Sequence, residues 1–162
     1  MRIHQKNRTR EKQRGSALIE IALSYSVLVL VAFITLKATI NASASQTWTV
    51  KQSMTDAYIT QESAFASRYP FDEISSDGSL WALYPDVTTS TVTVGRMPGG
   101  GEVAATLHRT RIPDSNNLAS AGGSGTATTN PGGTEAWKLQ SMLVYTVADK
   151  EYVKTRTTLR IR

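Results

Sequence analysis

The residues with the clearest chemical potential are Gly15, Ser16 and Glu20, at the start of a long apolar segment. Glu20 is the only formally charged side chain between Gly15 and Lys37. A carboxylate inside a membrane-spanning helix costs on the order of 2.5–3.5 kcal/mol on insertion scales, so such a group normally has a partner. Cleavage after Gly15 would give Ser16 a free α-amine, and this cation could neutralise Glu20 across two neighbouring helices. The alternative is a simple signal anchor with Glu20 near the headgroups, and these residues alone leave both interpretations open.

The apolar segment that carries Glu20, residues 16–36, has the length of a membrane span. As a helix its 21 residues would extend about 31 Å, which matches the hydrocarbon thickness of a bilayer. Residues 1–15 before it hold six basic residues and one acidic residue. Because positive charge is retained on the cytoplasmic side, residues 1–15 are predicted to lie in the cytoplasm and residues 38–162 outside it.

The charge balance argues against a nucleic-acid-binding protein. The chain has 18 Lys and Arg against 13 Asp and Glu, but residues 16–162 hold 12 of each. The basicity therefore belongs to residues 1–15 rather than to a folded domain. The chain also has no cysteine, which excludes disulfides and any cysteine-based metal or redox site.

The motif Gly15-Ser16-Ala17-Leu18-Ile19-Glu20 after a basic leader resembles the class III signal of type IV pilins and pseudopilins. The sequence of this motif is most similar to that of the TadE-like minor pseudopilins of tight-adherence systems. The resemblance implies that a prepilin peptidase cleaves between Gly15 and Ser16, and that Glu20 guides assembly with other pilin-like subunits on an inner-membrane platform. Ser16 replaces the phenylalanine with which major pilins usually begin, so N-methylation stays open. No proline interrupts residues 16–36, and both departures favour a minor subunit.

Residues 37–69 are predicted to continue the helix beyond the membrane. No proline precedes Pro70, and Gly15 is the only glycine before Gly78. At 100° per residue, an apolar stripe falls within an arc of about 120°. Its members are Ile40, Ala44, Trp48, Met54, Tyr58, Phe65 and Tyr69. This stripe is interpreted as the face that packs on the rest of the domain, and Pro70 ends the helix.

Beyond Pro70 the hydrophobic period changes from 3.6 to 2, which predicts strands. The strands are expected near residues 87–94, 102–112, 136–147 and 152–161. The third strand presents one strongly apolar face, made by Trp137, Leu139, Leu143, Tyr145 and Val147. Residues 71–86 are expected to form an irregular connector that fills the space between helix and sheet with Trp81, Leu83 and Tyr84.

The fourth strand alternates between apolar and basic side chains. Val153, Leu159 and Ile161 oppose a basic row made by Lys154, Arg156, Arg160 and Arg162. This row is interpreted as a solvated sheet face in preference to an anion- or polysaccharide-binding surface.

These elements predict an α+β fold of the pilin type, in which a long N-terminal helix packs on a four-stranded, mainly antiparallel sheet. The expected organisation is a removed leader (1–15), a transmembrane half-helix (16–36), an exported amphipathic half-helix (37–69) and a β-sheet head (70–162). The low-complexity stretch 113–134 within the head is expected to be a flexible loop.

Few residues suggest catalysis or ligand binding. His108 is a lone histidine on an expected strand, and no Cys/His cluster is present for zinc. The glycine runs at 99–101 and 122–125 lack the strand–glycine–helix context of phosphate loops and are interpreted as turns. Residues 114–117 offer oxygen ligands, but their spacing matches no defined calcium loop. We therefore expect no catalytic residue, no cofactor and no metal.

The leading hypothesis is a non-enzymatic pseudopilin in the inner (cytoplasmic) membrane, with a cytoplasmic N-terminus and an exported head. Its expected partners are the lipid bilayer, a prepilin peptidase, an assembly platform and other pilin-like subunits that contact residues 16–36. A second hypothesis is a permanent single-span anchor that presents a β-domain for binding without assembly. A third is a Sec-exported soluble domain that begins at Ser45, after the small residues Ala42-Ser43-Ala44.

Overall fold

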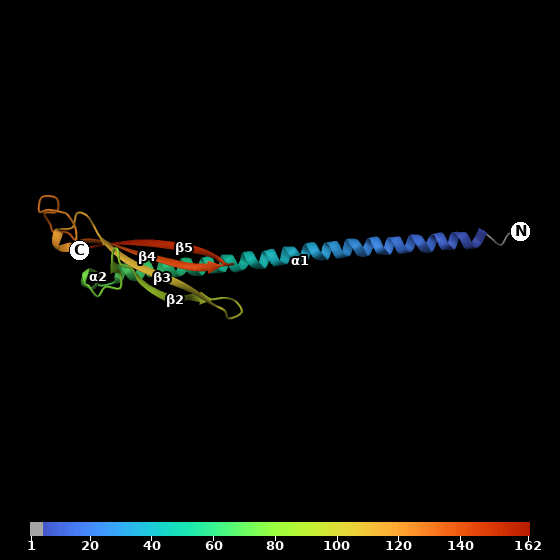
Figure 1. Cartoon of the computed structure of the whole chain (residues 1–162), viewed down its shortest axis with the longest axis horizontal. Helices are drawn as coiled ribbons and strands as arrows, with labels where there is room; N and C mark the ends of the chain where they lie inside the picture. Colours follow the sequence, from blue (N-terminus) through green and yellow to red (C-terminus); the bar gives the residue numbers. More distant parts are fainter. Residues whose placement is uncertain (1–4) are drawn as a thin grey trace. The chain divides into compact units, whose positions relative to one another are not determined.

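The structure is a computed structural model that describes the backbone of residues 5–162 and the side chains of residues 17–162. It divides into two compact units, Met1–Gln46 and Thr47–Arg162. We call the second unit the head. Helix α1 (Gln5–Arg68) runs through both units and is followed by the strands of the head (Figure 1).

Helix α1 ends where the sequence predicts. Its last residue is Arg68, and the amide of Tyr69 still donates to the carbonyl of Phe65 at 3.0 Å. Pro70 stops the helix because it has no amide proton and disfavours helical geometry in the residue before it. Pro70 instead precedes the short helix α2 (Phe71–Ser75).

The head contains a five-stranded mixed sheet rather than the predicted four-stranded, mainly antiparallel one. Its strands are β1 (Ala82–Leu83), β2 (Thr88–Arg96), β3 (Glu102–Pro113), β4 (Ala136–Val147) and β5 (Lys150–Ile161). β2, β3, β4 and β5 pair with their neighbours in antiparallel order, and β1 pairs with β3 in parallel. β1 was missed because a two-residue strand inside an irregular connector carries no period-2 signal. Its pairing depends on the neighbour that the fold supplies.

A tight connection joins β4 to β5. Val147 pairs with Lys150, and the two residues between them, Ala148 and Asp149, have φ values of 49° and 61°. Two consecutive positive φ values are those of a type I′ turn, whose twist matches that of the flanking strands.

The helix packs on the sheet through a face that only partly matches the predicted stripe: Tyr58 and Tyr69 of the stripe pack against the two apolar clusters of the head, but the fully buried residues are others. The buried residues of α1 are Thr55, Ile59, Glu62 and Ala66. Trp48 from the predicted stripe stays 46% exposed and Phe65 40% exposed. Small side chains such as Thr55 and Ala66 allow the helix to approach the sheet closely, whereas aromatic rings would hold the two apart.

The sheet side of the core matches the prediction. The predicted apolar face of β4 is buried throughout, from Trp137 to Val147, and Leu107 on β3 is fully buried beside it. Ile59 of α1 packs against Leu107 and Leu143 in one cluster, and Ala66 packs with Trp81 and Trp137 in a second.

Strand β5 is oriented the opposite way from the prediction. Two of its basic side chains contact α1 instead of solvent: Lys154 donates to the carbonyl of Gln52 at 2.9 Å, and Arg160 donates to the carbonyls of Ser67 and Tyr69. Arg156 and Arg162 of the same row stay exposed. The apolar side chains of this strand are the exposed ones, with Val153 at 53%, Leu159 at 54% and Ile161 at 61%. Arg160 donates hydrogen bonds to carbonyl groups near the end of α1, and Lys154 forms an ion pair with the carboxylate of Asp56. These contacts explain why the two basic side chains point toward the helix.

The connector between α1 and β2 is only partly as predicted. Trp81 is completely buried and fills the space between helix and sheet. Leu83 and Tyr84 were expected beside it, but they are 47% and 64% exposed.

The stretch 113–134 is built around two buried amides. The side-chain oxygen of Asn117 accepts from the backbone amide of Ala136 at 2.8 Å. The side-chain nitrogen of Asn117 donates to the backbone carbonyl of Ala136, also at 2.8 Å. Asn130 donates to the carbonyls of Asn116 and Thr134. A Cβ on Gly123 would lie 2.1 Å from the carbonyl oxygen of Asn117, so only glycine fits there. The flexibility expected for this stretch stays a prediction, but its conformation is specified by defined hydrogen bonds.

Candidate functional site

The first candidate site is the apolar part of α1. In the part of the chain that the structure describes, one helix near the N-terminus is long and apolar enough to cross a membrane, with a mean hydropathy of 2.4 over its most apolar window. None of that window is buried inside the protein. Several of its large side chains, among them Leu28, Val31 and Phe33, are more than half exposed. A surface this apolar is compatible with lipid or with other helices around it.

The hydroxyl groups in this part of α1 are compatible with lipid because the helix satisfies them itself. Ser26 donates to the carbonyl of Ala22 at 2.8 Å, Thr35 to that of Ala32 at 2.9 Å, and Thr39 to that of Thr35 at 2.9 Å. Such bonds to the carbonyl three or four residues earlier remove the cost of an unpaired hydroxyl in hydrocarbon.

Glu20 is different, because its carboxylate is exposed and has no partner among the residues whose side chains the structure describes. In a bilayer, a charge at that position would be compensated by a group from outside the described residues. The expected cleavage residues Gly15 and Ser16 lie within α1, but outside the residues 17–162 whose side chains the structure describes. The cleavage and pairing of these three residues therefore stay predictions.

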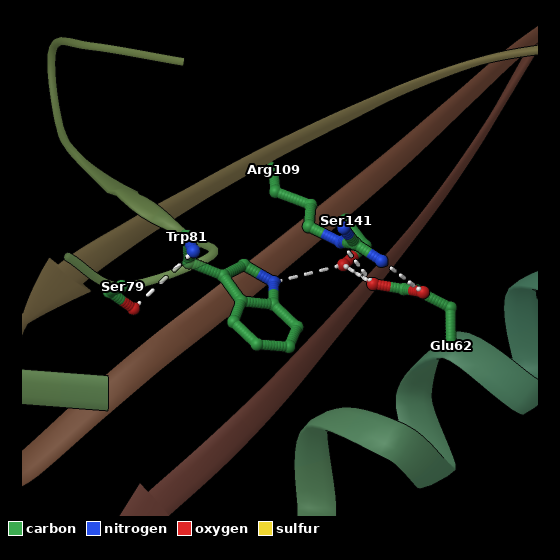
Figure 2. A network of polar contacts seen from close by, with 5 residues as sticks. All are labelled: Glu62, Ser79, Trp81, Arg109 and Ser141. Carbon is green, nitrogen blue, oxygen red and sulfur yellow. Dashed lines mark hydrogen bonds and ion pairs between the residues drawn. The ribbon is translucent and has the colours of Figure 1, made fainter. Parts of the chain in front are cut away.

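The second candidate site is a buried polar network between α1 and the sheet (Figure 2). Arg109 on β3 donates Nε–H to Glu62 Oε1 at 2.6 Å and Nη2–H to Glu62 Oε2 at 2.8 Å. Ser141 on β4 donates to the same carboxylate at 3.3 Å and accepts the indole N–H of Trp81 at 3.1 Å. Four residues from four separate segments thus share one hydrogen-bond chain.

The electrostatics of this network are those of a closed ion pair. Glu62 is 5% exposed, and its hydrogen bonds raise the pKa of Arg109 above the ordinary value for arginine. The guanidinium of Arg109 also lies over the Trp81 ring, 5.3 Å from its centroid. Burial and the Glu62 charge raise the pKa of the Tyr58 hydroxyl next to the pair. Both charges are compensated, so the network can fix the helix on the sheet but offers no free acid, base or nucleophile.

A pocket of about 260 Å³ opens beside this ion pair, lined by Tyr58, Gln61, Glu62, Phe65 and Arg109. Phe65 stacks on Trp81 with ring centroids 5.9 Å apart. The wall is therefore aromatic with a neutralised charge pair at its base. It has the composition of a contact surface rather than a reaction site.

Arg111, two residues further along β3, is a buried cation without a carboxylate partner among the described residues. It is 4% exposed, and its Nε and Nη1 have no hydrogen-bond acceptor there. Its guanidinium stacks on Trp137, 5.0 Å from the ring centroid. Burial lowers the pKa of Arg111, and the negative charge of Asp77 partly opposes this lowering. No sequence signal pointed to this environment, because the pairing of β1 with β3 beside Arg111 was not predicted.

The remaining candidates from the sequence have structural partners. His108 Nδ1 lies 2.9 Å from the hydroxyl of Thr89 on β2. Asp114 accepts from the amide of Asn116 and pairs with Lys138, and these contacts lower the pKa of Asp114. Among the described residues no group of three or more His, Cys, Asp or Glu side chains lies close enough to hold a metal ion.

The layout of the chain is pilin-like: a long N-terminal helix, apolar in its first part, is followed by a β-sheet on which its later part packs. No protein-family model, curated protein or solved structure matches the chain. The candidate function therefore rests on the residues and their geometry alone.

Proposed function

We propose that this protein is a non-enzymatic, pilin-like structural subunit of the pseudopilin type. In this proposal a prepilin peptidase removes residues 1–15, and residues 16–36 then hold the subunit in the inner membrane and pack against other pilin-like subunits. The observation that carries the proposal is the continuity of α1. One uninterrupted helix contains both the exposed apolar segment and the buried face of Thr55, Ile59, Glu62 and Ala66 that holds the sheet.

The continuous helix supports a role in assembly for a physical reason. No proline or glycine interrupts residues 16–68, so the apolar segment and the head-bound segment belong to the same hydrogen-bonded helix. A head that only needed a tether would be served by a flexible linker. A helical connection is useful where the packing of spans must set the spacing of heads.

Glu20 supplies the specificity in this proposal. A carboxylate in the membrane favours a site where a cation compensates it, and the α-amine of Ser16 becomes available only after cleavage. Pairing between neighbours would make assembly depend on processing. The head supports the alternative function, a permanent anchor that binds a ligand, through the pocket beside Glu62 and Arg109.

Processing is the direct test. Co-expression with a prepilin peptidase should shorten the full chain so that it begins at Ser16, as measured by the intact mass of the membrane-extracted protein. Gly15→Val should block the change, and Gly15→Ala serves as the conservative comparison. A mature chain that begins at Ser45, or a chain that keeps residues 1–15, would contradict the proposal.

A further inference from the structure

Asp77 and Gly78 are the one place in the chain where an aspartate precedes a glycine, and no asparagine precedes a glycine. The backbone nitrogen of the residue after an aspartate can attack the side-chain carboxyl carbon and close a five-membered ring. A side chain on that next residue hinders the attack, and glycine has none. This pair is therefore the position where ring closure meets the least steric resistance.

The structure places the pair in an exposed turn of the connector. The amide of Ser79 donates to the carbonyl of Ser76 at 3.2 Å, so Asp77 and Gly78 occupy the two central positions of a β-turn. Both residues are exposed, and a Cβ added to Gly78 would have no atom within 4 Å. Among the described residues the Gly78 amide donates no hydrogen bond, and the Asp77 carboxylate is in no ion pair or hydrogen bond. Neither reacting group is thus tied to a partner that would hold it away from the other.

The two nearest aspartates along the chain lack this combination. Asp72 lies in helix α2 and forms an ion pair with Arg162. Asp86 is exposed, but the β-branched side chain of Val87 crowds the nitrogen that would have to attack. Both aspartates are therefore natural comparisons for Asp77.

We propose that Asp77 is a site of spontaneous isomerisation to isoaspartate, which loosens the connector where it joins the core of the head. In the first step the carboxylate takes a proton from solvent, and the nitrogen of Gly78 attacks the carboxyl carbon Cγ. A C–N bond forms, a C–O bond breaks, and the carboxyl hydroxyl leaves with the amide proton as water. The product is a succinimide ring that joins the two residues.

Water then opens this ring at one of its two carbonyl groups. Breaking the bond between the Gly78 nitrogen and Cγ restores aspartate, whereas breaking the bond between the same nitrogen and the main-chain carbonyl carbon of Asp77 gives isoaspartate. The carboxyl group that is released returns its proton to solvent, so no atom is gained or lost and water is the only co-reactant. The reaction depends on the head alone, so it holds whether or not the chain assembles with other subunits.

Isomerisation changes the connector between two anchors. Ile74 and Trp81, on either side of the turn, are both completely buried. In isoaspartate the main chain passes through Cβ and Cγ, so one more backbone atom has to fit between these anchors. The added atom lies next to Ser79, whose hydroxyl accepts the amide of Trp81 at 3.4 Å. The extra length therefore weakens the hold of the connector on the ring that fills the space between helix and sheet.

The test uses the full-length chain in phospholipid vesicles, kept at neutral pH in heavy-oxygen water. Each opening of the succinimide leaves one heavy oxygen atom in the residue. Trypsin then releases residues 69–96 as a single peptide, because no Lys or Arg lies between Arg68 and Arg96, and fragmentation in a mass spectrometer locates the label. We expect heavy oxygen and isoaspartate at Asp77 and neither at Asp72 or Asp86, which are internal controls in the same peptide.

Two variants test the chemistry. Gly78→Ala should lower the rate of labelling about ten-fold, which corresponds to about 1.4 kcal/mol on the activation barrier. This variant should fold, because Gly78 has no positive φ and the added Cβ meets open space. Asp77→Asn is the positive control and should react faster through the same ring, because its amide is uncharged at neutral pH and the carboxylate has to take up a proton first.

Limited proteolysis measures the effect on the connector. Chymotrypsin, which cleaves after aromatic residues, should cut isomerised chains after Trp81 several-fold faster than unmodified chains, because a loosened connector opens more often. Gly78→Ala chains aged in the same way are the control and should keep their original rate of cleavage.

Three outcomes would overturn the proposal. Labelling of Asp77 only after denaturation in urea would show that the folded turn prevents the attack. Equal labelling of Asp72, Asp77 and Asp86 would show that the turn has no special reactivity. Equal cleavage of isomerised and unmodified chains would show that the connector is not loosened.

Discussion

Arg109 holds Glu62 in a two-point contact, with Nε 2.6 Å from Oε1 and Nη2 2.8 Å from Oε2, and this pair joins α1 to the middle of the sheet. It lies between the two apolar clusters of the head, one around Leu107 and Leu143 and the other around Trp81 and Trp137. A buried polar pair at that position restricts how the helix can slide or rotate on the sheet, because any other register would leave both charges unpaired.

The first prediction follows from this pair. Arg109→Met should destabilise the fragment Ser45–Arg162 by about 3–5 kcal/mol, because the Glu62 carboxylate would stay buried without its partner. The measurement is urea unfolding followed by circular dichroism. The double variant Glu62→Met/Arg109→Met is the control and should recover most of the loss. A single variant as stable as the parent would contradict the closed ion pair.

The second prediction concerns two tryptophans with similar sequence signals. Trp137→Ala should lower the free energy of unfolding by about 3–5 kcal/mol, because this ring is buried under Arg111. Trp48→Ala should change it by less than about 1 kcal/mol, because the ring is 46% exposed. Equal losses in the two variants would show that the packing face of α1 is wrongly assigned.

The third prediction concerns acid stability. The pKa of Asp114 is lowered in the folded state by the amide of Asn116 and by Lys138. A lowered folded-state pKa means that the charged form stabilises the fold above the unfolded pKa and that this contribution is lost as the pH falls through the folded pKa. Asp114→Asn should therefore reduce stability near neutral pH and flatten its decline below about pH 4. Urea midpoints across the acid range provide the measurement, with Asp149→Asn as an exposed control.

The fourth prediction concerns Glu20 and separates assembly from simple anchoring. Glu20→Gln should insert normally, because a neutral amide is easier to place in lipid. It should nevertheless lose cross-linking between Val27→Cys copies in membranes that contain a prepilin peptidase, because the α-amine of Ser16 has no carboxylate to pair with. Equal cross-linking in the parent and in the Glu20→Gln variant would remove the pairing mechanism even if cleavage after Gly15 occurs.

Much of the head could be predicted from alternation along the chain. The apolar face from Trp137 to Val147 and the end of α1 before Pro70 follow directly from the sequence, because period-2 patterning and proline sterics act locally. The predicted site residues Gly15, Ser16 and Glu20 likewise rest on local sequence. The network of Glu62, Arg109, Ser141 and Trp81 was not predicted, since its members lie up to 79 residues apart and none forms a motif.

The alternation of apolar and polar residues left open which face of each element is buried, and the tertiary structure decided it. The sequence by itself determined that β5 has a basic side and an apolar side, but only the fold decided that Lys154 and Arg160 point inward, toward Asp56 and the carbonyl groups of α1. It also decided that Thr55 and Ala66, rather than Trp48 and Phe65, lie against the sheet. Patterning assigns residues to faces, but which face is buried depends on partners and on the space available, and both exist only once helix and sheet have met.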